Sequence, residues 1–151
     1  MGSKKIIIGS DHAGFNLKEV VKKILGREGF EFEDVGTFDT SSCDYPIFAF
    51  QAGEKVVKNN TLGILICSSG EGICLAANKV KGVRAGIAYN DDVASLLREH
   101  NDANIVCFGA NFMREEDVIR RAITFLTTDC LEGRHRRRVD LIKTYEDEHM
   151  K

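Results

Sequence analysis

The chain has 151 residues, with 21 Lys and Arg against 23 Asp and Glu and a net charge of −2 at pH 7. This length is enough for one domain whose core needs neither disulfides nor metals. The nearly balanced charge excludes the strongly basic surface that is typical of nucleic-acid-binding proteins, so we expect no nucleic-acid partner.

No apolar run approaches the roughly 18 residues of a membrane span, and the first residues, MGSKKIII, lack the long apolar core of a secretory signal. We therefore expect a soluble, cytoplasmic protein without a membrane partner. The five cysteines, at positions 43, 67, 74, 107 and 130, form no CxxC pair and have no zinc-like spacing, which predicts reduced thiols and no metal. The chain has one proline and no repeat, so no linker divides it and a single domain over 1–151 is predicted.

The first two predicted elements are a strand and an amphipathic helix. The β-branched run Lys5–Gly9 predicts a short strand. Over Phe15–Glu28 the apolar residues recur at positions i, i+3, i+4, i+7 and i+8, a pattern that is typical of a helix packed on one face. Gly29 ends this helix, and a second strand is predicted immediately after it.

The rest of the chain continues this alternation. The segment Leu62–Cys67 is fully apolar, as in the central strand of a parallel sheet. The other predicted strands are 30–35, 83–89 and 104–109, and the other predicted helices are 47–58, 73–79, 91–100, 115–128 and 136–149. The alternation predicts an α/β fold of three layers, with a five-stranded parallel sheet, helices on both faces and a C-terminal helix.

Ligands bind parallel sheets at the carboxyl ends of the strands. Four predicted loops share that edge, with the sequences SDHAG, CSSGEG, YNDD and GAN. In the second loop, Gly70 and Gly72 let the backbone approach a ligand and turn several N–H groups inward next to Cys67. This loop predicts an anion-binding site beside a thiol.

The chemistry of Cys67 has several possible interpretations. A nucleotide-binding P-loop is excluded because Phe15 stands where the lysine after Gly14 is required. A cysteine phosphatase needs an arginine six positions after the cysteine, and that position is Ile73. The thiol then remains as a base that removes a carbon-bound proton, or as one more small buried residue.

Other segments supply candidate polar partners. Asp11 and His12 leave the first strand together, and His100 ends the fourth predicted helix, where it can also simply favour the helix dipole. Arg134 and Arg138 are four positions apart, so both guanidinium groups can bind one phosphate.

Together these segments resemble the type B ribose-5-phosphate isomerases, a family that is grouped with the galactose-6-phosphate isomerase subunits. The resemblance extends from about Ile6 to Ile142 and is carried by GSDHAGFNLKE, VGTFDTSSCDYP, ICSSGEGICLAANKVKGVRAGIAYN, REHNDANIVCFGAN and GRHRRRVDLI. It implies a Rossmann-like sandwich, no metal or nucleotide cofactor, and interconversion of ribose 5-phosphate and ribulose 5-phosphate through an enediolate.

The resemblance also implies roles for individual residues. Cys67 matches the base that moves a proton between C2 and C1, while Ser69 and His100 match residues that open the sugar ring. The residues that match substrate-binding positions are Asp11, His12, Tyr45, Ser68, Gly70, Glu71, Gly72, Asn101, Arg134 and Arg138. One branch of the family uses a glutamate base at the position of Ile73, so the retained cysteine indicates the other branch.

Three positions depart from the family pattern. Ser68 replaces a glycine, Glu71 stands where an apolar residue or asparagine is usual, and Asn111 replaces an arginine that helps to bind phosphate. Arg114 is a candidate substitute for that arginine. These departures leave two alternatives open: an isomerase of a six-carbon sugar phosphate, such as allose 6-phosphate or galactose 6-phosphate, and a non-catalytic sugar-phosphate-binding module.

The resemblance implies a homodimer or a dimer of dimers with shared active sites. In such an assembly His100 and Asn101 of one subunit complete the pocket around Cys67 of the other. The predicted C-terminal helix fits this arrangement, because its apolar residues are spread round it and form no continuous stripe toward its own chain.

Overall fold

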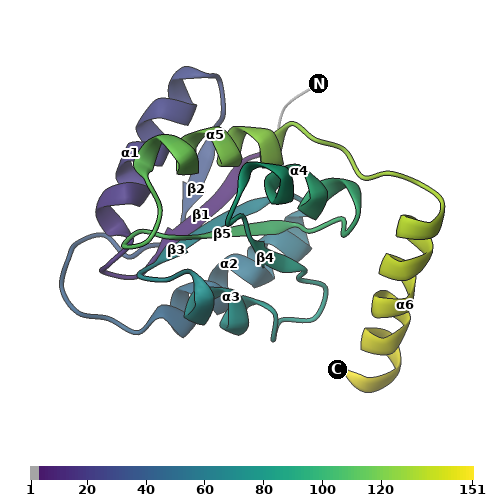
Figure 1. Cartoon of the computed structure of the whole chain (residues 1–151). Coiled ribbons are helices and arrows are strands. Elements are labelled where there is room, and N and C mark those ends of the chain that lie inside the picture. The colour runs from purple at the N-terminus through teal and green to yellow at the C-terminus, as the bar shows by residue number, and fades with distance from the viewer. Residues whose placement is uncertain (1–3) are drawn as a thin grey trace.

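The computed structural model describes residues 4–151, which form a five-stranded parallel sheet in the order β2-β1-β3-β5-β4 (Figure 1). The strands are β1 (Ile6–Ser10), β2 (Phe32–Asp34), β3 (Gly63–Cys67), β4 (Ala85–Ile87) and β5 (Ile105–Gly109). The predicted parallel α/β sheet is confirmed. Residues 1–3 of the predicted 1–151 domain lie outside the described part of the chain.

The three central strands are largely apolar and lie in the core. Every residue of β1, β3 and β5 is buried, while β2 and β4 at the sheet edges are only partly buried. A strand that is covered on both faces needs apolar side chains on both sides, and the sequences IIIGS, GILIC and IVCFG largely meet this requirement.

Helices cover both faces of the sheet, so the predicted three-layer sandwich is also confirmed. One face packs against α1 (Phe15–Arg27), α4 (Asp91–Glu99) and α5 (Glu115–Leu126), and the other against α2 (Tyr45–Asn59) and α3 (Glu71–Ala77). Neighbouring strand residues such as Leu65 and Ile66 belong to opposite core layers, as the alternation of side chains along a strand requires.

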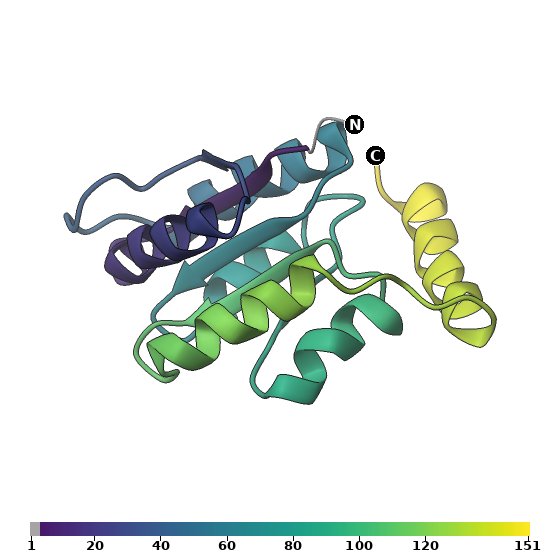
Figure 2. The same cartoon turned by 90° about the horizontal axis from the view of Figure 1, so that it is seen from above.

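Helix α6 (Arg134–His149) lies apart from these layers, beside the edge at which the strands begin (Figure 2). Val139 is its one buried residue, and the apolar side chains of Leu141, Ile142 and Tyr145 are 65%, 48% and 62% exposed. The predicted lack of a continuous apolar stripe is confirmed, and much of the apolar surface of the helix stays uncovered in the single chain.

Several predicted boundaries were wrong by a few residues. Helix α3 begins at Glu71 instead of 73, because Gly70 adopts a positive φ of 84° and turns the chain directly into the helix. Helix α2 begins at Tyr45, so Pro46 lies inside its first turn, where the missing N–H is harmless. Strand β4 is shorter than predicted, because it pairs with β5 only over 85–87. Helix α6 begins two residues early, at Arg134.

A buried ion pair joins α1 to the end of β2. Lys18 is fully buried, and its Nζ lies 2.7 Å from both carboxylate oxygens of Asp34 and donates to the Thr37 carbonyl at 2.5 Å. Burial alone would raise the pKa of Asp34, but hydrogen bonds from Lys18, Lys22 and the Gly36 N–H hold that pKa below its ordinary value. The ion pair fixes the start of the segment 36–44, which joins β2 to α2 at the carboxyl edge of the sheet.

Replacing Lys18 by methionine should destabilise the fold by about 3 kcal/mol, because removing one partner of a buried pair leaves the other charge poorly compensated. Urea denaturation of the variant measures this loss. Lys23→Met is the matched control, since Lys23 is an exposed lysine of the same helix. Equal stability of the two variants would show that Lys22 and the Gly36 N–H are sufficient for Asp34.

Candidate functional site

Cys67 and Asp11 lie next to each other at the carboxyl edge of the sheet. Cys67 is the last residue of β3, and Asp11 follows the neighbouring strand β1 and donates its N–H to the Ile66 carbonyl at 3.3 Å. The two residues are only 4% and 6% exposed. Asp11 Oδ1 accepts the Gly14 N–H at 3.0 Å, which holds the carboxylate in place at the start of α1.

The loop after Cys67 packs tightly against the end of β5. The Gly70 N–H donates to Cys67 Sγ at 3.2 Å, so the thiol sulfur is held by the loop that follows it. A Cβ at Gly70 would lie 3.0 Å from the Phe108 carbonyl carbon, and its positive φ also favours glycine. A Cβ at Gly109 would collide with the backbone carbonyl of Ser69. The close approach of the loop to the end of β5 therefore needs glycine at both position 70 and position 109.

The far side of the loop faces Tyr45. A Cβ at Gly72 would come within 2.6 Å of the Tyr45 ring, which shows that this ring lies directly over the loop. Ser69 Oγ accepts the Glu71 N–H at 3.1 Å, just before the first turn of α3. The predicted group Cys67, Ser69, Gly72 and Tyr45 is therefore contiguous in the structure.

The sequence did not predict two contacts of this site. Asn111 Nδ2 donates to Ser68 Oγ at 2.7 Å, so a residue noted only as a departure contacts the loop directly. The Cys43 N–H donates to Nδ1 of His12 at 3.2 Å, which leaves the ring hydrogen of neutral His12 on Nε2, as a donor for a ligand. Residues far apart in the sequence make both contacts, and no local pattern signals them.

The opposite edge of the sheet holds the remaining predicted site residues, which are His100, Asn101, Arg134 and Arg138. His100 follows α4 and stands before β5, whereas Cys67 pairs with the last residue of β5. The length of that five-residue strand, about 13 Å, separates the two edges. His100 stacks on His135 at the start of α6, with ring centroids 3.8 Å apart and an interplanar angle of 5°. One chain thus holds two separate groups of predicted site residues.

The second group is rich in positive charge. Burial lowers the pKa of His135, and the charges of His100, Arg134 and Arg138 lower it further, which favours a neutral His135 beside two cationic arginines. His135 was not among the predicted site residues, although its position between Arg134 and Arg136 was a signal. Asn101, next to His100, is exposed at the same edge. This group can bind an anion.

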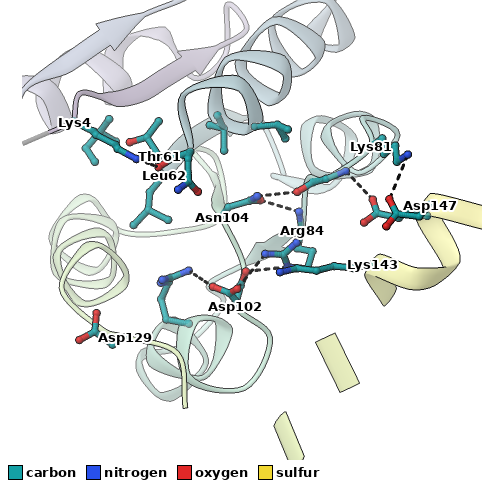
Figure 3. Close-up of a pocket in the computed structure, with 17 residues that line it drawn as sticks. Lys4, Thr61, Leu62, Lys81, Arg84, Asp102, Asn104, Asp129, Lys143 and Asp147 are labelled. Atoms are coloured by element: carbon teal, nitrogen blue, oxygen red, sulfur yellow. Dashed lines mark hydrogen bonds and ion pairs between the residues drawn. The ribbon is translucent and has the colours of Figure 1, made fainter. Parts of the chain in front are cut away.

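Asp102 anchors the second group. It accepts hydrogen bonds from Arg136 at 2.7 Å, Arg98 at 3.1 Å and Arg84 at 3.3 Å. Figure 3 shows Asp102 beside Arg84. Burial would raise the pKa of Asp102, but the Arg136 hydrogen bond and the charges of Arg84, Arg98 and Arg136 hold it below its ordinary value. These bonds fix the 100–102 segment relative to the start of α6.

A cavity of about 910 Å³ lies at this amino edge, between α6 and the body of the protein (Figure 3). Its charges are largely paired, since Arg84 contacts Asp102 and Lys81 lies 3.4 Å from Asp147. Among the described residues, those that line it include no cysteine or histidine. It is therefore not the place of thiol chemistry, despite its size.

A smaller cavity, of about 550 Å³, adjoins the loop after Cys67. Its described lining includes Ser69, Glu71 and Arg114. The structure thus places Arg114, the candidate substitute for the missing arginine, beside the loop that was predicted to bind an anion. Glu71, Asp117 and Arg121 line the same cavity, so an anion there would meet two positive and two negative side chains.

Within residues 4–151 no group of three or more His, Cys, Asp or Glu side chains is arranged to hold a metal ion. In the same part of the chain, the helices are too short or too polar to cross a membrane.

Comparison with known proteins identifies the class. Residues 6–142 match the family model described as Ribose/Galactose Isomerase. A probable ribose-5-phosphate isomerase B of Mycoplasma genitalium is 43% identical over 97% of this chain and 98% of its own. The ribose-5-phosphate isomerase B of Mycobacterium tuberculosis is 35% identical, over 99% of this chain and 94% of its own.

Solved structures agree with these matches. A Mycoplasma genitalium ribose-5-phosphate isomerase B with bound ribulose 5-phosphate superimposes with a TM-score of 0.93, at 41% identity over 98% of this chain and 99% of that one. The Clostridium thermocellum ribose-5-phosphate isomerase B gives the same TM-score at 40% identity, over 97% of this chain and 99% of that one. The protein is thus an α/β isomerase. It belongs to the ribose/galactose isomerase family.

Proposed function

We propose that this chain is a single-domain ribose-5-phosphate isomerase that interconverts ribose 5-phosphate and ribulose 5-phosphate, with Cys67 as the base. The observation that carries the proposal is the position of the Cys67 thiol, which lies at the carboxyl edge beside Asp11 and is held by the Gly70 N–H. The names of the relatives support the substrate, since ribose-5-phosphate isomerase B recurs among them at 35–43% identity.

The chemistry follows from a thiolate beside a loop of backbone donors. Cys67 removes the proton on C2 of the open aldose, and the resulting enediolate places negative charge on the oxygens of C1 and C2. N–H groups of the Ser68–Gly72 loop stabilise that charge, because donors held in advance need no reorganisation. One hydroxyl hydrogen passes from the C2 oxygen to the C1 oxygen, and the thiol returns its proton to C1.

The other site residues bind the sugar and open its ring. In this proposal Ser69 and His100 assist ring opening, while Asp11 and Asn101 bind sugar hydroxyls. Arg134, Arg138 and His12 bind the phosphate, because two guanidinium groups and a ring N–H are matched donors for its oxygens. Tyr45 and Glu71 line the pocket. No metal or organic cofactor takes part, and the enzyme works in the cytoplasm.

The separation of the two groups supports a shared active site. Within one chain the Cys67 group and the His100 group lie at opposite edges of the sheet, so neither is complete. A homodimer, alone or paired into a dimer of dimers, brings His100 and Asn101 of one subunit to Cys67 of the other. The exposed apolar side chains of α6 offer surface for such an assembly.

Turnover of a panel of sugar phosphates tests the proposed activity. We expect the highest kcat/KM for ribose 5-phosphate, with allose 6-phosphate and galactose 6-phosphate lower by about 10-fold or more, because the pocket must reject an extra carbon unit. A maximum with a hexose phosphate would instead identify a six-carbon isomerase. Calorimetric binding of ribose 5-phosphate without turnover at any pH would identify a binding module.

The Cys67→Ala variant tests the base. We expect kcat to fall by about 10²–10⁴, while binding of ribose 5-phosphate stays largely unchanged, because the lost group acts mainly in the transition state. Cys130→Ala is the matched control, since Cys130 is a partly buried thiol near the amino edge. A kcat near that of the wild type in Cys67→Ala would make Cys67 a structural residue.

Mixing two inactive variants tests the shared site. In a dimer of Cys67→Ala with His100→Ala subunits, one pocket carries both defects and the other carries neither. Half of the dimers then have half of their sites intact, so subunit exchange should restore about a quarter of the wild-type activity. Mass spectrometry verifies the exchange. Mixed dimers that remain inactive would place both residues in the site of one chain.

A further inference from the structure

Two hydrogen bonds connect Ser68 and Asn111, the second one through their side chains. The Asn111 backbone N–H donates to the Ser68 carbonyl at 3.0 Å, and Asn111 Nδ2 donates to Ser68 Oγ at 2.7 Å. Beside them, the Ala110 N–H donates to the Cys67 carbonyl at 2.9 Å. The loop after β3 is thereby attached to the loop after β5 at Cys67 and Ser68.

The loop after Cys67 has little rigidity of its own. Gly70 is one of the three residues between β3 and α3, and glycine has the greatest backbone freedom in the unbound chain. Ser68 is the first residue of this loop and the one that Asn111 holds by its side chain. A side-chain bond at this point restricts the peptide that joins the thiol to the flexible part of the loop.

We infer that the Ser68–Asn111 side-chain bond is a positioning device for the reaction. It keeps Cys67 and the loop N–H groups in the arrangement that the enediolate requires, without contact between Asn111 and the reacting atoms. This inference rests on the proposed isomerase function. Displacements of about 1 Å can lower a rate by roughly 10²-fold, so one bond at the base of the loop is sufficient to affect turnover.

Removal of either side chain tests the inference. We expect Ser68→Ala and Asn111→Ala each to lower kcat by about 10- to 100-fold with KM changed less than about 2-fold, because the loss concerns the transition state. The double variant should be no slower than the slower single variant, since both changes remove the same bond. Additive losses would overturn the inference.

Ser68→Thr is the conservative variant that should retain activity. The threonine hydroxyl can accept from Asn111 Nδ2 as the serine hydroxyl does, so the connection is kept without a new charge. Asn16→Ala is the matched control, because Asn16 lines the same cavity of about 270 Å³ as Asn111. A loss in Ser68→Thr as large as that in Ser68→Ala would contradict a positioning role.

A measurement independent of turnover separates this inference from the proposed function. Amide hydrogen exchange of residues 67–72 should be faster in Asn111→Ala than in the wild type, while the unfolding midpoint stays within about 2 °C of it. An inactive wild-type protein would refute the proposed function. An active wild type together with fully active Ser68→Ala and Asn111→Ala variants would refute the positioning role alone.

Discussion

The contact between the loop after Cys67 and the end of β5 is the constraint on which the candidate site depends. The carbonyl of Ser69 lies against Gly109, and the turn at Gly70 lies against the Phe108 backbone. A side chain at either glycine would push the loop outward and take the Gly70 N–H away from the Cys67 sulfur. Close backbone packing of this kind explains how a flexible sequence can hold a thiol in one position.

Two of the three departures from the family pattern are bonded to each other. The resemblance leads us to expect a glycine at position 68 and an arginine at position 111, whereas the side chains of Ser68 and Asn111 share the 2.7 Å hydrogen bond. This bond is an additional connection between two loops. The third departure, Glu71, lines a cavity together with Arg114, so the local charge there is nearly balanced.

Different interactions hold the site residues in place at the two edges of the sheet. At the carboxyl edge the site depends on backbone contacts and on the segment fixed by the buried Lys18–Asp34 pair. At the amino edge three arginines converge on Asp102 and hold the His100 segment beside α6. Helix α6 buries only Val139, whereas the sandwich helices pack through apolar faces on the two core layers.

The sequence by itself determined the sheet, because fully apolar runs such as Leu62–Cys67 have no other stable place than a strand covered on both faces. It also identified the carboxyl edge, since the loops with Asp11 and Cys67 both follow strands. Only the tertiary structure joined Asn111 to Ser68 and stacked His135 on His100. Those contacts join residues that lie between 35 and 43 positions apart, and hydrophobic periodicity carries no information on such distances.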